Sequence, residues 1–182
     1  EDHIVKLLNL IKERHSELAK DEKIKYIYPF ENKGEAVGVT MPHPHGQLYG
    51  YSFVPQKLQV ELDSAKDHHH EHGECLFCKM NQVEKEKDAR IVGENDSFLA
   101  YIPFFTDYPY GVFVVPKRHM NYITDCTEKE TKDLAHMLKT LTEAFDRLFN
   151  MPFPYMMVYH QNPVNSPEYA GHEEYYHFNI QF

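Results

Sequence analysis

The sequence predicts an α+β fold, in which an antiparallel sheet has helices packed on one face. Two segments have the apolar spacing of amphipathic helices, and several short stretches rich in Val, Ile, Tyr and Phe are typical of strands. One order of elements (helix, strand, loop, strand) also occurs twice along the 182 residues. We therefore expect two related repeats that together bury a substantial core.

The first helix is expected over residues 3–19, where apolar residues recur at helical spacing. The alternating stretch 23–30 predicts a strand, and residues 36–41 predict a second one after a loop at Gly34. Residues 63–74 are polar and unpatterned, which predicts a linker. The chain is accordingly divided into a first unit, residues 1–62, and a second unit, residues 75–182.

The second unit is expected to alternate strands with one long helix. That helix begins at Thr127, because Glu130 completes a capping box ahead of a helical run of Leu and Phe residues, and it ends at Asn150. The first two strands of this unit are joined by a turn at Asn95-Asp96. The expected strands cover residues 89–95, 97–104, 111–117, 155–161 and 176–182.

The repeated order of elements relates residues 1–47 to residues 127–181. Aligning the two copies sets His43 against His177, His45 against Asn179, and Gln47 against Gln181. The first copy lacks an equivalent of the segment that precedes the helix of the second. We therefore interpret the chain as one that begins inside its first repeat.

Charge and cysteine content limit the class of protein. A formal net charge of -9 argues against a general surface for nucleic-acid polymers, which needs clustered Lys and Arg. No apolar run of about 18 residues predicts a membrane span, and no secretory signal opens the chain. Three cysteines, two of them in a C-x2-C pair, fit a reducing compartment. These observations predict a cytoplasmic protein with no membrane partner.

Two histidines lie one residue apart in the segment MPHPHGQ. Side chains two apart on a strand point to the same face, so His43, His45 and Gln47 would share one surface. An isolated histidine on a strand is more often structural than catalytic. His45 is a better candidate, because it shares its face with another histidine and a glutamine beside a Gly-containing loop.

Cys75 and Cys78 supply half of a tetrahedral zinc site, and His119 and His177 are candidates for the other two ligands. A pair of buried thiols without metal is the alternative reading. The histidine run 68–72 also suggests metal binding. We expect it to belong to a solvated linker, because contiguous histidines in a flexible segment have no preorganised geometry.

The second unit resembles a histidine-triad domain in CLFCKM, VGENDSFLAYIPF and YGVFVVPKRHMNYITDCTEKE and in its final histidine strand. The segment FENKGEAVGVTMPHPHGQ resembles more specifically the active-site signature of the galactose-1-phosphate uridylyltransferase family, in which two such repeats form one subunit. Together these similarities cover almost the whole chain.

The resemblance implies an enzyme that exchanges UMP between UDP-glucose and galactose 1-phosphate by a ping-pong mechanism, through a uridylyl-histidine. By this resemblance His45 is the nucleophile, Gln47 bonds the nucleotidyl phosphate, and His43 binds zinc. It also implies a homodimer with zinc at the cysteine centre. Three residues match positions that hold the phosphates: Asn32, Gly38 and Thr40. Glu61 and His160 match part of a second metal site found in some members.

The chemistry of these residue types agrees with transfer rather than hydrolysis. A neutral imidazole is a competent nucleophile near pH 7, and sugar-phosphate leaving groups need no strong general acid. Gln47 can donate a hydrogen bond to a phosphoryl oxygen but cannot shuttle a proton. Gly34 and Gly38 would let backbone amides approach phosphates. Asn179 cannot form a phosphoramidate, so the second repeat is expected to be structural.

Two other functions stay open at this point. One is a dinucleoside-polyphosphate phosphorylase or hydrolase of the histidine-triad superfamily. The other is a zinc-stabilised nucleotide-binding module without catalysis. The replacement of the nucleophilic histidine by Asn179 in the second copy favours this function.

Overall fold

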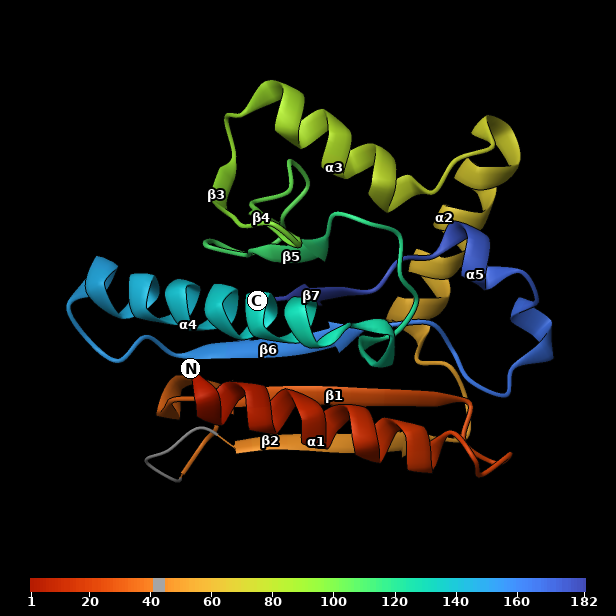
Figure 1. The fold of residues 1–182 in the computed structure, drawn as a ribbon, viewed down its shortest axis with the longest axis horizontal. Helices are drawn as coiled ribbons and strands as arrows, with labels where there is room; N and C mark the ends of the chain where they lie inside the picture. The colour runs from red at the N-terminus through yellow and green to blue at the C-terminus, as the bar shows by residue number, and fades with distance from the viewer. Residues whose placement is uncertain (41–44) are drawn as a thin grey trace.

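The fold is a seven-stranded antiparallel sheet with helices on both faces, as the computed structural model shows for residues 1–40 and 45–182 (Figure 1). The α-helices are α1 (Asp2–Leu18), α2 (Gln56–His72), α3 (Leu76–Lys87), α4 (Glu128–Phe149) and α5 (His172–Tyr175). The strands are β1 (Tyr26–Lys33), β2 (His45–Tyr51), β3 (Ile91–Glu94), β4 (Phe98–Tyr101), β5 (Phe113–Pro116), β6 (Tyr155–His160) and β7 (Asn179–Gln181). The expected α+β class is confirmed.

The sheet has the strand order β2-β1-β6-β7-β5-β4-β3. The antiparallel pair β1 and β6, each the first strand of a helix-strand-strand segment, joins the two segments within this sheet (Figure 1). The two segments also pair in the same way: Asn32 lies opposite His45, and His160 lies opposite Asn179. The sheet is therefore continuous across both segments. The division into units at 1–62 and 75–182 stays a prediction.

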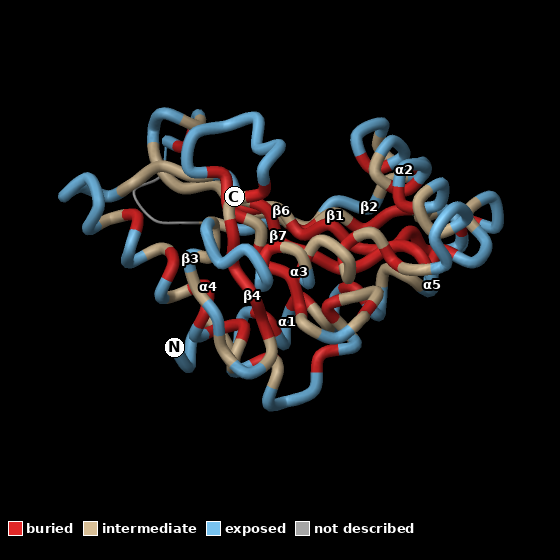
Figure 2. Tube along the Cα trace, turned by 90° about the horizontal axis from the view of Figure 1, so that it is seen from above, coloured by how far each residue is buried: buried red, intermediate tan, exposed pale blue. Residues whose placement is uncertain are grey.

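The main core lies between the sheet and the pair α1 and α4. Leu8 and Ile11 of α1 and Leu134 of α4 belong to this core, together with the strand residues that point to the same face. Figure 2 shows the strands as the buried layer of the molecule. The prediction that all helices lie on one face of the sheet is wrong. Helices α1 and α4 share one face, whereas α2 packs against Tyr26 and α3 against Leu99 on the opposite face.

Helix α4 and the β3–β4 hairpin form as predicted. Thr127 caps α4: its hydroxyl accepts from the Glu130 amide, and the Glu130 side chain accepts from the Thr127 amide. The Asn95 amide donates to the Phe98 carbonyl at the predicted turn. Within residues 1–40 and 45–182, no helix is both long enough and apolar enough to cross a membrane.

The expectation that residues 63–74 are unpatterned is wrong, because most of this segment belongs to helix α2. Its position between two units stays a prediction. Leu58, Leu62 and Ala65 are buried at helical spacing and pack beneath Tyr26. The polar residues between them cover the solvent side of the same helix. Only the last part of the segment leaves the helix, after Gly73 adopts a left-handed conformation.

The strand predicted at 36–41 is also wrong where the structure describes it. Residues Glu35–Val37 form a short 3-10 helix, η1, between Gly34 (φ 98°) and Gly38 (φ 81°). Both glycines have conformations that side-chain-bearing residues rarely adopt, so the chain turns here instead of extending. The second strand of this hairpin is β2, which begins at His45. Helix α3, which carries Cys78, was not predicted.

Candidate active site and metal centre

The predicted nucleophile is the first residue of β2. His45 is half-buried and lies directly opposite Asn32, near the end of β1. Paired residues of an antiparallel ladder point to the same face, here the one opposite α1 and α4. The Oδ1 atom of Asn32 is buried and has no hydrogen-bond partner among the described residues. Such an atom is a candidate contact for a ligand.

The other predicted substrate contacts lie in the same hairpin. Gln47 is exposed and shares the face of His45, two residues along β2. Gly38 ends η1, and the space where its Cβ would be is open. Thr40 is exposed in the segment that leads toward β2. His43 lies outside the described residues, so its predicted role as a metal ligand stays a prediction.

The equivalent strand of the second copy has a different environment. Asn179 and Gln181 of β7 are buried, and the Gln181 amide donates to the Asn179 side-chain oxygen at 3.0 Å. The Asn179 amide donates to the His177 carbonyl at 3.1 Å. These side chains bond to the protein itself, whereas Gln47 is open to solvent. This contrast supports a chemical role for β2 and a structural one for β7.

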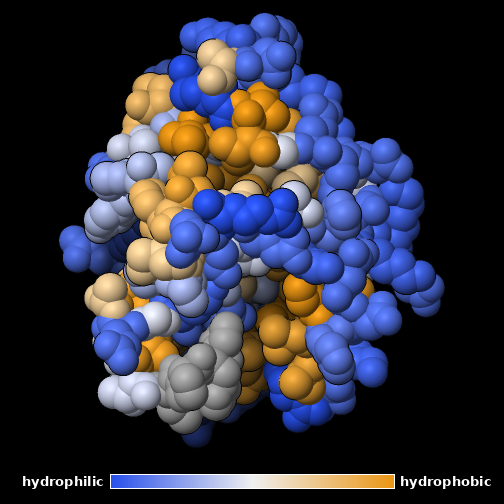
Figure 3. Space-filling model, turned by 90° about the vertical axis from the view of Figure 1, so that its left-hand side faces the viewer, coloured by the Kyte–Doolittle hydropathy of each residue, from blue (hydrophilic) through white to orange (hydrophobic). Residues whose placement is uncertain are grey.

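Exposed apolar residues lie beside the hairpin. The Cβ of Pro154 approaches the site of a Gly34 Cβ to 2.7 Å, so the segment that follows α4 lies against the hairpin. This segment and the loop after β4 form an aromatic group, with the rings of Phe149 and Phe153 stacked at 4.8 Å and Tyr110 at 5.1 Å from Phe149. Figure 3 shows hydrophobic residues gathered on this end of the molecule.

The four predicted zinc ligands of the second unit meet at one point. One ligand atom from each of Cys75, Cys78, His119 and His177 lies within 4.8 Å of the other three, and this is the one such group among the described residues. Cys78 Sγ is 3.5 Å from Nδ1 of both histidines. The prediction that these residues converge is confirmed, and together they can hold a metal ion.

Backbone geometry explains how these ligands come together. Cys75 caps α3 and Cys78 lies in its first turn, so both thiols point from one helix end. His119 follows β5, and His177 precedes β7, which is paired with β5. His119 Nε2 donates to the Glu173 carbonyl at 2.8 Å, which leaves Nδ1 as the coordinating atom. Glu173 was not predicted, because a backbone carbonyl has no sequence signature.

The charges in this cluster suit a cation. The pKa of Cys75 is held well below its usual range, chiefly by the hydrogen bond from the Cys78 thiol and to a smaller extent by the two histidines. The pKa of Cys78 is raised, because its thiol proton is held in the bond to Cys75. Burial lowers the pKa of His177, which keeps its imidazole neutral as a ligand must be. Two sulfur and two nitrogen donors are a set that zinc binds in tetrahedral geometry.

The cysteine cluster and the hairpin histidine lie at opposite ends of the strands. His45 pairs with Asn32, near the last residue of β1. His177 comes just before Asn179, the first residue of β7, and Asn179 pairs with His160. Because β1 and β6 are antiparallel, the end of β1 that carries Asn32 is far along the sheet from His160. A metal ion held by the cysteines would therefore stabilise the fold without touching a group bound at His45.

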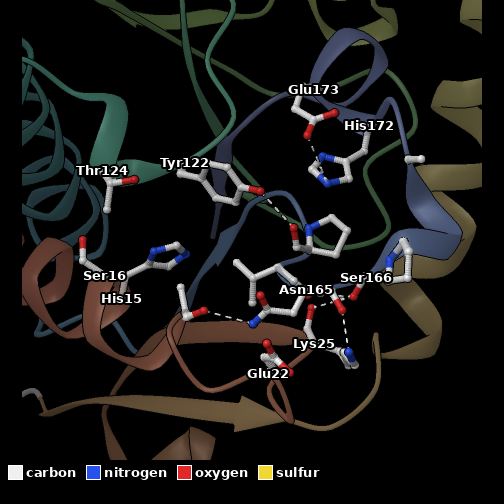
Figure 4. Close-up of a pocket in the computed structure, with 15 residues that line it drawn as sticks. His15, Ser16, Glu22, Lys25, Tyr122, Thr124, Asn165, Ser166, His172 and Glu173 are labelled. Atoms are coloured by element: carbon white, nitrogen blue, oxygen red, sulfur yellow. Dashed lines mark hydrogen bonds and ion pairs between the residues drawn. The ribbon is translucent and has the colours of Figure 1, made fainter.

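A pocket of about 810 Å³ lies on a different part of the molecule, between the end of α1 and the segment before α5 (Figure 4). Its polar groups largely bond to each other: the Tyr122 hydroxyl donates to the Pro163 carbonyl, and Lys25 Nζ donates to the Asn165 carbonyl. Burial lowers the pKa of His15, on its wall, to about 4. None of the predicted site residues lines this pocket, so we do not place the chemistry here.

Comparison with known proteins decides the family. Residues 1–55 match the N-terminal domain of galactose-1-phosphate uridyl transferase, and residues 61–182 match its C-terminal domain. The chain belongs to the galactose-1-phosphate uridyl transferase family. It spans about half the length of the curated relatives it matches.

Three proteins of known identity illustrate the similarity. Galactose-1-phosphate uridylyltransferase of Thermotoga maritima is 36% identical over 179 residues, which cover 98% of this chain and 55% of the relative. A solved uridylyltransferase structure superposes with a TM-score of 0.89 at 35% identity, over 98% of this chain and 54% of that one. An ADP-glucose phosphorylase from Arabidopsis thaliana, solved with bound ADP-glucose, gives a TM-score of 0.86 at 27% identity over 98% and 55%.

Glu61 and His160, for which the resemblance implied part of a second metal site, bond to each other in this chain. His160 Nδ1 lies 2.9 Å from a Glu61 carboxylate oxygen, and the Tyr176 hydroxyl donates to the same oxygen at 2.7 Å. Burial alone would raise the pKa of Glu61, but the charge and hydrogen bond of His160 lower it below its ordinary value. The pair ties α2 to β6.

Replacing Glu61 with glutamine should lower the free energy of unfolding by about 2 kcal/mol at pH 7, because hydrogen bonds to a buried charge are lost. The lowered pKa means that this stabilisation is present above the pKa of an unfolded glutamate and disappears as the pH falls through the folded value. Urea unfolding of both proteins should therefore converge at acidic pH. Glu71→Gln, an exposed change on the same helix, should have almost no effect.

Proposed function

We propose that this chain carries the nucleotidyl-transfer site of an enzyme that exchanges UMP between UDP-glucose and galactose 1-phosphate, in galactose metabolism. Family membership supports the proposal, and the observation that carries it is the β1–β2 hairpin. There His45 and Asn32 lie side by side on an open face of the sheet, followed by the exposed Gln47.

In the first half-reaction, a neutral imidazole nitrogen of His45 attacks the phosphorus of the uridylyl group. A nitrogen–phosphorus bond forms, and the bond to the bridging oxygen breaks, so that glucose 1-phosphate leaves with the electron pair. In the second half-reaction a phosphate oxygen of galactose 1-phosphate attacks the same phosphorus. UDP-galactose is released, and the electron pair returns to the imidazole.

The remaining hairpin residues position the phosphates. Gln47 donates a hydrogen bond to a phosphoryl oxygen, and the Asn32 amide contacts the substrate from the neighbouring strand. Gly38 and Thr40 border the phosphate site from the connecting loop. These contacts stabilise charge in the transition state without moving a proton.

We further propose that the metal of the cysteine cluster is zinc, because two thiolates and two neutral imidazoles are a typical closed structural zinc site. Such an ion would link α3 to the end of β5 and the start of β7. Its role would be structural, and it would not act as a Lewis acid at phosphorus. We also propose that His43 binds a zinc ion of its own, apart from the cysteine cluster.

Incubation with UDP-glucose, without acceptor, tests the function. Mass spectrometry should find one uridylyl group on the peptide that contains His45, and galactose 1-phosphate should remove it. The second candidate function is that of a phosphorylase, and the 27% identity to the Arabidopsis ADP-glucose phosphorylase favours it. A parallel incubation with ADP-glucose distinguishes this function from uridylyl transfer. Preferential adenylylation would establish that alternative, and no adduct from either sugar would favour a non-catalytic nucleotide-binding module.

A homodimer and a cytoplasmic location complete the proposal. The exposed apolar residues beside the hairpin, among them Tyr110 and Met151, support an interface close to the site. The three cysteines are all free thiols, which supports a reducing compartment.

A further inference from the structure

An ion pair holds the chain at the point where β1 ends and the loop with η1 begins. Lys33 is the last residue of β1 and lies between Asn32 and Gly34. Its Nζ lies 2.8 and 3.0 Å from the two carboxylate oxygens of Asp146, in the last turn of α4. The ends of β1 and α4 therefore meet at the same end of the molecule (Figure 1).

The Lys33 side chain points away from the face that carries His45. Asn32 shares the face of His45, and side chains alternate along a strand, so Lys33 points to the side of α1 and α4. There its ammonium lies over the ring of Tyr155, its partner on β6, at 5.6 Å from the ring centre. The Lys33 side chain is only 19% exposed, so solvent screens this ion pair less than a fully exposed one. Lys33 can act on the site only through the backbone.

Asp146 also holds the segment that packs against the start of the loop. Its Oδ1 accepts from the Phe153 amide at 2.7 Å, and the next residue is Pro154, whose Cβ is 2.7 Å from the site of a Gly34 Cβ. Partial burial would raise the pKa of Asp146, but the bonds from Lys33 and Phe153 lower it below its ordinary value. One charged carboxylate thus holds Gly34 from two sides, through Lys33 before it and through Pro154 against it.

The position of Gly34 determines the position of the rest of the loop. The Gly34 carbonyl accepts from the amides of Val37 and Val39, each at 3.3 Å. These amides flank Gly38, and Thr40 follows, so the two proposed phosphate contacts lie on backbone that is bonded to Gly34. Misplacement of a binding group by about 1 Å can slow a reaction by about a hundredfold.

We propose that Lys33 and Asp146 are positioning residues for nucleotidyl transfer, which hold residues 34–40 in place against the phosphates of the nucleotide sugar. The inference rests on the proposed function, since the loop has its phosphate contacts only in that reaction. Neither side chain touches the reacting atoms. Loss of either one leaves the imidazole of His45 intact but lets the loop move, so the phosphates bind more weakly and transfer slows.

Asp146→Asn tests the anchor, because it keeps the size of the side chain and removes its charge. Its uridylylation by UDP-glucose, measured in a single turnover, should be at least about tenfold slower than that of the unchanged protein, with a raised KM for UDP-glucose. Lys33→Met should show the same losses. The double variant should lose no more than either single variant, because the two side chains act as a unit. Lys33→Arg keeps the cation and should retain most of the rate.

Arg90→Met is the matched control for lost stability. It breaks the ion pair with the buried Glu84 beside β3, at the opposite edge of the sheet from β2. It should lower the unfolding midpoint at least as much as Asp146→Asn and leave the transfer rate and KM within about twofold, as expected for a pair that touches no substrate contact. Equal kinetic losses from Arg90→Met would overturn the inference, because stability and not position would then set the rate. Normal kinetics of Asp146→Asn would also overturn it.

Amide hydrogen exchange of the loop distinguishes the anchor from the proposed function, because it needs no turnover. The amides of Val37, Gly38 and Val39 bond within the loop and should exchange at least about tenfold faster in Asp146→Asn than in the unchanged protein. If the unchanged protein formed no uridylyl adduct, the proposed function would fail, whereas faster exchange in the variant would still support the anchor. Unchanged exchange in the variant would reject the anchor at any level of activity.

Discussion

Replacing His45 with glycine should reduce UMP exchange by at least about a thousandfold, because the covalent route through the imidazole is removed. The rest of the hairpin can still bind nucleotide, so the loss should appear in kcat far more than in KM. The measurement is the steady-state rate of UDP-galactose formation. Incubation with labelled UDP-glucose should also leave no label on the variant.

The fold should tolerate this change. His45 is the first residue of β2, and the equivalent place in β7 is occupied by Asn179, so His45→Asn is a second variant that the strand accommodates. Both variants should keep the thermal unfolding midpoint within a few degrees. His136→Asn, an exposed histidine on α4, should keep full activity. Normal exchange by His45→Gly protein would refute the uridylyl-histidine mechanism.

The features that the sequence predicts correctly are those with a local physical cause. Helix α4 has a capping box at Thr127 and a continuous apolar stripe, so both its start and its buried face follow from neighbouring residues. The same-face relation of His45 and Gln47 follows from the period of a strand. The meeting of Cys75 and Cys78 with two distant histidines was predicted from chemistry, because a C-x2-C pair needs two further ligands.

The wrong predictions share a different cause. Residues 63–72, the last part of α2, were mistaken for an unpatterned segment, because Ala65 is the one buried residue among them and the buried Leu58 and Leu62 lie before it. Their burial depends on Tyr26, Tyr175 and Tyr176, which are distant in sequence. The loop after β1 was mistaken for a strand, because the apolar residues on both sides of Gly38 suggested an extended chain, whereas Gly34 and Gly38 both adopt positive φ and turn it. For α2, tertiary contacts decide between conformations that local preference allows.

The correction to α2 changes how the two ends of the molecule relate to function. A flexible linker would leave the two segments free to move, whereas α2 packs on the same face of the sheet as His45 and connects to β6 through Glu61. The hairpin end offers open polar side chains and exposed apolar surface, which suits substrates and partners. The other end holds buried, mutually bonded polar groups and the cysteine cluster, which suits a structural role.

Replacing Cys75 with serine should abolish tight zinc binding and destabilise the protein by several kcal/mol. Structural zinc in small domains contributes about 10–16 kcal/mol of apparent binding free energy, and part of it is folding free energy. The ligand set joins α3 to residues beside β5 and β7, so its loss should loosen this end of the sheet first. Zinc content after dialysis should fall by one equivalent, and the thermal unfolding midpoint should fall markedly.

Cys126→Ser separates the metal effect from the loss of a buried thiol. Cys126 is buried against Met120 and lies outside the ligand cluster, and burial raises its pKa to about 12. This variant should lose stability slightly but keep its zinc. A strong chelator should lower the unfolding midpoint of the unchanged protein and of Cys126→Ser, and it should have little further effect on Cys75→Ser. If chelation destabilised Cys75→Ser as much as the unchanged protein, the stabilising metal would lie elsewhere, because a serine hydroxyl cannot replace the thiolate that this tetrahedral site requires.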